Sequence, residues 1–213
     1  MTTEFTYVSI APWLRDLTVI TPGCPPKIRK RMFQQAAREF FEQSCVWRAV
    51  IGPEDHAAGE VEYELSPFDD NAVVTRVHRV EYKGSGIAAM AARPHGDEPD
   101  AVGFLAYYLD APDKVHLWPT LSTEEEDALT FFVSLQPEEN FTLLPQFAQT
   151  HLFDALFDGA AGRLLAQPAK PYSDPTRAQY HLQRFRAAIG KYSAQGKSNF
   201  SGAPTWCFPR FGK

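Results

Sequence analysis

The segment TPGCPPKIRKRMFQQAAREFFEQSCVWR, residues 21–48, sets three prolines directly ahead of a long amphipathic pattern. Pro25 or Pro26 suits a first helical position, where the missing N–H costs nothing. The pattern predicts a helix from about Pro26 to Val46, entered through a rigid corner and packed on one side only. Its apolar face consists of two rows that repeat every fourth residue, namely Ile28, Met32, Ala36 and Phe40, and Phe33, Ala37, Phe41 and Cys45.

Three other segments have helical periodicity. A short helix is predicted within residues 7–17, a second between Pro145 and Pro168, and a third from Pro175, capped by Ser173 or Asp174, to Gly196. Each carries one apolar stripe, so we expect the helices to bury these stripes against one another as a bundle. In the second helix, the small residues of the segment GAAG, 159–162, would let a neighbouring helix approach closely.

Between these helices the pattern changes to that of strands. Short runs of alternating or β-branched residues are separated by Gly, Pro and Asp, which indicates a small antiparallel sheet or barrel. The strand candidates are EVEYEL (60–65), AVVTRVHRVEY (72–82), GFLAYYL (103–109), KVHLW (114–118) and ALTFFVSL (128–135).

The sequence therefore predicts an α+β fold in four segments. Residues 1–52 form the first part of a helical bundle, residues 53–139 an inserted antiparallel β domain, and residues 140–196 the second part of the bundle. Residues 197–213 form an extended C-terminal arm.

Charge is distributed unevenly along the chain. The net charge of the whole chain is −5. From Lys170 to the end there are eight basic residues and one acidic residue, Asp174, so this segment has a net charge of +7 and the rest of the chain has −12. A basic end suits contact with an acidic partner, with another copy of the chain or with nucleic acid. We expect four basic residues of the last helix to face another subunit: Arg177, Arg184, Arg186 and Lys191.

The last stretch, KSNFSGAPTWCFPRFGK, has no periodicity but is rich in aromatic and basic residues. Aromatic side chains are costly to leave in water, so this arm is expected to dock on a partner or a neighbouring subunit. Its docking residues are Lys197, Phe200, Trp206, Phe208, Arg210, Phe211 and Lys213.

Signatures of catalysis and cofactor binding are missing from the sequence. There is no phosphate-binding loop and no G-x-S-x-G, and the six histidines do not have zinc-ligand spacing. The three cysteines form no C-x-x-C pair and are expected to be reduced. We therefore assign no catalytic residue, metal or cofactor, and expect a non-enzymatic protein.

Two weaker possibilities for a site remain open. Glu54, Asp55 and His56 could reach a cation from a loop, although a solvated turn is the commoner outcome for such residues. His78 and His116 lie in strand candidates and could meet across the sheet. The N-terminal residues lack a signal-peptide pattern and no apolar run is long enough to cross a bilayer, so synthesis in the cytoplasm and no membrane partner are expected.

Several motifs, in this order along the chain, carry a resemblance to a known family. PGCP precedes AAREFFEQSCVWR; VEYELSP is followed by VTRVHRVEY; then come YYLDAPDKVHLWP and KPYSDP, which opens a helix containing His181 and Phe185. This ordered set resembles the head-to-tail adaptor, or connector, proteins of tailed bacteriophages, of the tail tubular protein A kind.

The resemblance implies a structural protein of the virion. Such adaptors form a ring, here expected to be dodecameric, below the portal protein, where they extend the DNA channel and join the tail nozzle or tail tube proteins. Their C-terminal arm docks on the portal, and contact with translocating DNA is non-specific. The resemblance thus implies a protein made in the host cytoplasm and located at the head-to-tail junction.

Two alternatives from other classes remain. One is a cell-wall hydrolase carried in the virion, which would use loop carboxylates or histidines such as Glu54, Asp55 and His56. The other is a non-specific DNA-binding module that uses the basic C-terminal third, whose binding would weaken steeply with salt.

Overall fold

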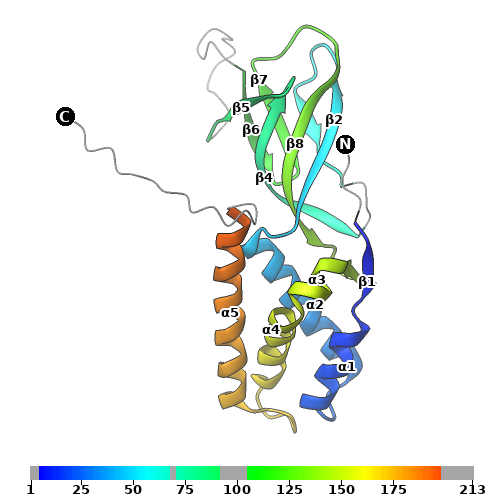
Figure 1. Ribbon diagram of the computed structural model, residues 1–213, viewed down its shortest axis with the longest axis vertical. Coiled ribbons are helices and arrows are strands. Elements are labelled where there is room, and N and C mark those ends of the chain that lie inside the picture. The colour runs from blue at the N-terminus through cyan, green and yellow to red at the C-terminus, as the bar shows by residue number, and fades with distance from the viewer. Residues whose placement is uncertain (1–4, 68–70, 92–104, 198–213) are drawn as a thin grey trace, which may run out of the picture.

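Helices gather at one end of the long axis and a curled sheet occupies the other (Figure 1). The computed structural model describes residues 5–67, 71–91 and 105–197. These contain five helices, a seven-stranded mixed sheet and a two-stranded sheet, which confirms the α+β class. The division into four segments stays a prediction.

The long helix expected after the proline corner is α2, Pro26–Ser44. Pro25 is extended and Pro26 takes the first helical position, as predicted. The helix ends when Cys45 adopts a left-handed conformation, with φ 50°. The predicted apolar stripe is confirmed, because Phe33, Ala36, Ala37, Phe40 and Phe41 are all buried.

The N-terminal segment differs from the prediction. Residues Tyr7–Ser9 form strand β1, which pairs with β9, Leu143–Pro145, and helix α1 spans Ala11–Ile20. Pro12 explains the difference, since proline is tolerated in the first turn of a helix but not deeper inside it.

The single helix expected after Pro145 is interrupted. It consists of α3, Gln146–His151, and α4, Phe153–Leu165, with Leu152 between them at φ −114°, outside the helical range. The last helix, α5, spans Pro175–Lys197. Asp174 caps it as predicted, because its carboxylate accepts a hydrogen bond of 3.0 Å from the N–H of Arg177.

The small residues of α4 allow α5 to pack closely, as the sequence indicated. α4 also contacts α1 and α2, and α2 contacts α5, so the helices form one packed group. The expected bundle of separate sequence segments is therefore present among the described residues.

The large sheet has the strand order β2-β8-β4-β5-β6-β7-β3. Most neighbours are antiparallel, but β5 and β6 pair in parallel, so the prediction of an antiparallel sheet is wrong at this point. A tight turn forces antiparallel pairing, whereas the longer connection between β5 and β6 leaves room for the chain to return in the same direction. The strands are β2 Arg48–His56, β3 Glu62–Glu64, β4 Ala72–Tyr82, β5 Ser85–Ala89, β6 Ala106–Ala111, β7 Lys114–Trp118 and β8 Glu125–Pro137.

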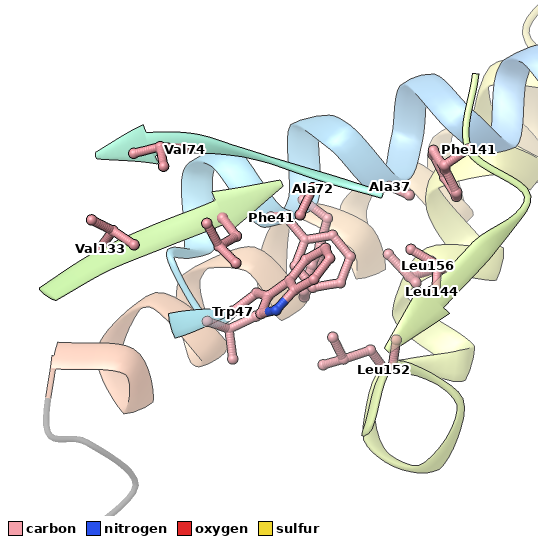
Figure 2. Close-up of a cluster of buried hydrophobic side chains, with 14 of the residues drawn as sticks. Ala37, Phe41, Trp47, Ala72, Val74, Val133, Phe141, Leu144, Leu152 and Leu156 are labelled. Carbon is pink, nitrogen blue, oxygen red and sulfur yellow. The ribbon is translucent and has the colours of Figure 1, made fainter. Parts of the chain in front are cut away.

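One continuous hydrophobic core joins the helices to the sheet. Trp47, between α2 and β2, lies at the junction, with its ring 5.4 Å from that of Phe41 and 5.7 Å from that of Phe5. Figure 2 shows Phe41 and Trp47 between Val74 and Val133 of the sheet and the leucines near α3 and α4. The two ends of the molecule therefore share buried side chains at the point where they meet.

Within the described ranges, no helix combines the length and apolar character needed to span a membrane. Cys24 and Cys45 are buried free thiols, as expected. The third cysteine, Cys207, lies outside the described residues.

Candidate docking surfaces

The predicted subunit-interface residues lie on the exposed surface of α5. Arg177, Arg184 and Lys191 recur every seven residues and therefore share one side of the helix. Arg186 is also exposed but lies on another side of α5. The structure thus brings three of the four residues into one basic row, here called the α5 row.

Arg184 is held in place by its neighbours. Its Nε lies 3.0 Å from Oδ2 of Asp158 on α4, and its Nη1 donates a hydrogen bond of 3.1 Å to the hydroxyl of Tyr180. The hydrogen bond with Tyr180 and the charge of Asp158 raise the pKa of the Arg184 guanidinium. Arg184 is therefore oriented before any partner arrives.

The same carboxylate also holds a buried histidine. Oδ1 of Asp158 lies 2.8 Å from Nδ1 of His181, and both residues are buried. Edge-on contacts with the rings of Phe157 and Tyr180 enclose the imidazole. Asp158 of α4 thus contacts two side chains of α5, His181 and Arg184. Because His181 holds the Asp158 carboxylate in place, the two residues together position Arg184.

A polar groove of about 890 Å³ runs along the outer face of α2. Three of its basic residues lie near the start of the helix, whereas Arg38, Glu39 and Glu42 lie nearer the end, and Glu139 lines it from the segment after β8. The sequence identified this face as polar but did not show that the loop after β8 closes one side of it. The basic residues of the groove are Lys27, Lys30, Arg31 and Arg38.

A second groove, which we call the junction groove, lies where α5 passes the start of the sheet. It has a volume of about 590 Å³. The indole N–H of Trp47 in its wall is buried and has no hydrogen-bond partner among the described residues. Sequence reasoning missed this groove, which is lined by Phe5, Val46, Trp47, Arg48, Phe147, His151, Leu152, Lys191, Tyr192 and Gln195.

The two ends of the molecule have opposite charge. In the helical part, basic residues outnumber acidic ones, whereas acidic residues dominate the part that contains the sheet. The sheet part bears Glu54, Asp55, Glu60, Glu62, Glu64, Glu81, Asp110, Asp113, Glu124, Glu125, Glu126 and Asp127, against Arg48, Arg76, Arg79, Lys83 and Lys114. The uneven charge found along the sequence is thus also a difference in charge between the two ends of the long axis. The basic residues of α2 contribute to it as well as those of α5.

The three residues considered for a cation or hydrolytic site do not act together. His56 is buried and forms a hydrogen bond with the hydroxyl of Tyr63, whose pKa burial raises to about 12. Asp55 accepts a hydrogen bond of 2.8 Å from the N–H of Asp127, and Glu54 is exposed. Across the described parts of the chain, no group of three His, Cys, Asp or Glu side chains could hold a metal ion.

The two strand histidines are not neighbours, because β5 and β6 separate β4 from β7. Nε2 of His78 lies 2.6 Å from Oγ of Ser134, and Nε2 of His116 lies 2.9 Å from Oδ2 of Asp110. The expectation that His78 and His116 meet across the sheet is therefore wrong.

The predicted arm falls largely outside the described residues. Lys197 is the last residue of α5, and its side chain is not described. The other arm residues, all beyond the described part, are Phe200, Trp206, Phe208, Arg210, Phe211 and Lys213.

Comparison with known proteins gives no family assignment. The sequence matches no protein-family model. It also matches no curated protein sequence.

Proposed function

We propose that this protein is a head-to-tail adaptor of a tailed bacteriophage. It would form a ring, expected to be dodecameric, below the portal protein, join the head to the tail nozzle or tail tube, and extend the DNA channel. The proposal starts from the ordered motifs described above. The structural observation that carries it is the opposite charge of the two ends of the molecule.

A connector must bind different partners at its two ends. Complementary charge favours the right partner and disfavours the wrong one, because like charges brought together are repelled. The basic helical end suits an acidic surface and the acidic sheet end suits a basic one. A chain with this polarity is therefore oriented by electrostatics when it is placed between two partners.

A ring also needs two different surfaces on each subunit that meet head to tail. The α5 row is basic, and the end of the α2 groove presents Glu42 and Glu139. The α5 row and the carboxylates of Glu42 and Glu139 have opposite charge and belong to different elements. Because Arg184 is already oriented by Asp158 and Tyr180, less side-chain entropy is lost when it binds.

The adaptor proposal is tested by the mass of the assembly. We would measure light scattering and native mass spectra of the protein alone and with the portal protein of the same phage. The charge reversals Arg184→Glu and Lys191→Glu should prevent ring formation, whereas Arg186→Glu, exposed on another side of α5, should leave the ring intact. Rings that form equally well in all three variants would exclude the α5 row as the interface.

The arm is tested in the same assay. Trp206→Ala combined with Phe208→Ala should abolish binding to the portal without changing the fold, which far-ultraviolet circular dichroism would check. A protein that stays monomeric and never binds the portal, in any form, would contradict the adaptor proposal.

One observation favours the alternative of non-specific DNA binding. Lys27, Lys30, Arg31 and Arg38 line one face of α2, where they could contact phosphates. Binding to a random DNA duplex that weakens steeply with salt, and is lost in Lys30→Glu with Arg31→Glu, would support this function. The hydrolase alternative has no comparable support, because His56 is buried against Tyr63.

A further inference from the structure

The junction groove has the properties of a docking site for a short peptide. Its volume of about 590 Å³ lies within the range of roughly 300–1,000 Å³ typical of ligand pockets. Phe5, Trp47, Phe147 and Tyr192 give it aromatic walls, and polar groups come from Arg48, His151, Lys191 and Gln195. Such walls favour an occupant with large apolar side chains.

One of the lining residues, Trp47, also has a hydrogen-bond donor that lacks an acceptor among the described residues. Trp47 is 1% exposed, and its indole N–H is buried without a partner among the described residues. A buried donor that forms no hydrogen bond is costly, so an occupant that supplies a carbonyl oxygen would be favoured. Figure 2 shows the indole of Trp47 beside Phe41, between Val133 of the sheet and Leu152. An extended peptide carries such carbonyl groups along its whole length.

We propose that residues 198–213 of the same chain occupy this groove in the free subunit. The segment follows directly after α5, whose last turns supply Lys191, Tyr192 and Gln195 to the groove. It therefore begins at the rim of the site. It contains the aromatic residues Phe200, Trp206, Phe208 and Phe211, which match the aromatic walls.

Covalent connection favours this occupant over a separate one. A tethered segment has an effective concentration of about millimolar at a nearby site, so even a weak interaction is populated. Pro204 and Pro209 are unfavourable inside a helix, and a peptide that is not helical has backbone carbonyl groups available as acceptors.

Charge decides which side chains enter. Arg48 and Lys191 lie at the groove, so Arg210 and Lys213 remain outside it in water, and aromatic rings take the places beside the cations. An acidic peptide of a partner would match these cations better in charge. Such a partner would displace the segment, which would then be free to dock elsewhere.

The inference is independent of the adaptor proposal, because it concerns one chain in solution. Docking in the junction groove would shield the aromatic side chains of the segment from water until a partner binds. A free subunit would thereby avoid non-specific association through exposed aromatic side chains.

Disulfide trapping in the full chain tests the inference, because Cys207 lies between Trp206 and Phe208. We would introduce His151→Cys, at an exposed residue that lines the groove, and compare it with Thr150→Cys, its exposed neighbour that does not. With oxidised glutathione as oxidant, the His151→Cys variant should form an intramolecular disulfide with Cys207 at least tenfold faster than the control. Cys24 and Cys45 are buried and should not compete.

A second variant shows whether the aromatic side chains are responsible. Adding Trp206→Ala and Phe208→Ala to His151→Cys should remove the rate difference. Equal rates for His151→Cys and Thr150→Cys would overturn the inference. Disulfides formed only between two molecules would overturn it in favour of docking on a second copy. Ring formation does not enter this measurement, so its outcome is separate from that of the adaptor proposal.

Discussion

Gly159 of α4 lies directly against the ring of Phe185 of α5. A Cβ atom built on Gly159 would lie 2.5 Å from Cε2 of Phe185 and 3.1 Å from the Cβ of Ala36 on α2. Phe185 is buried, and its ring also lies below the guanidinium of Arg163, 5.3 Å away. Three helices therefore meet at a position where only a hydrogen atom fits.

Gly159→Ala should destabilise the protein by about 1–3 kcal/mol, because the added methyl group overpacks a buried contact that cannot move freely. The gain in helix propensity, roughly 1 kcal/mol, offsets only part of this cost. Urea unfolding would measure the change in the free energy of unfolding.

Gly190→Ala is the matched control for this prediction. Gly190 lies in α5, is exposed and has nothing within 4 Å of a built Cβ, so alanine should stabilise the protein by up to about 1 kcal/mol. If Gly159→Ala and Gly190→Ala change the free energy of unfolding in the same direction, the close packing of α4 on α5 does not require glycine at position 159.

Asp158→Ala should lower the free energy of unfolding by about 2–3 kcal/mol. The buried His181 loses its acceptor, and Arg184 loses its ionic partner. Asp154→Ala, at an exposed position one turn earlier in α4, should change stability by less than about 1 kcal/mol. Thermal and urea unfolding of both variants would check this. Equal losses of stability in the two variants would show that the contacts of Asp158 with His181 and Arg184 do not stabilise the protein.

The sequence predicted those features that depend on local periodicity. The buried stripe of α2 and the cap at Asp174 depend on residues within or next to one helix, and the small residues at Gly159 and Gly162 are visible in the sequence, although the helix that packs on them is not. Hydrophobic spacing and capping chemistry are local properties, so a single sequence is enough to find them. Strands β4 and β7 were predicted with the correct bounds for the same reason.

Features assembled from distant segments could not be found in this way. The junction groove combines residues near positions 5, 47, 150 and 192, which no motif connects. The contact between His181 and Asp158 is known only once the rotation of α4 against α5 is fixed. The parallel pairing of β5 with β6 depends on the direction in which a long connection returns, which spacing does not specify.

His78 should make stability depend on pH. Burial, with smaller contributions from the charges of Arg48 and Arg76, lowers the pKa of His78 from 6.5 to about 4. Between pH 4 and 6.5 the unfolded chain therefore binds more protons than the folded one. The contribution of His78 is fully present above about pH 6.5 and is lost as the pH falls toward 4.

His78→Asn tests this dependence. The variant should lose less stability than the unaltered chain between pH 7 and pH 5, measured as the midpoint of urea unfolding at each pH. The effect should be modest, because part of the His78 side chain is exposed and solvent screens its charge. Parallel losses in both proteins, or a His78 imidazole that titrates near its ordinary pKa by nuclear magnetic resonance, would contradict the prediction.

Gln34→Leu should destabilise the protein even though it places an apolar residue at a buried position. Nε2 of Gln34 on α2 donates a hydrogen bond of 2.7 Å to the carbonyl oxygen of Phe141, in the segment between β8 and β9. Leucine fills similar space but leaves this buried carbonyl without its donor, which costs about 1–3 kcal/mol. Gln35→Leu, at the exposed neighbouring position, should stay within about 0.5 kcal/mol of the unaltered protein. Urea unfolding of the pair separates the two cases. A neutral Gln34→Leu would mean that the hydrogen bond does not help to hold the segment between β8 and β9 on α2. A loss confined to Gln34→Leu would show that this hydrogen bond contributes to holding that segment on α2.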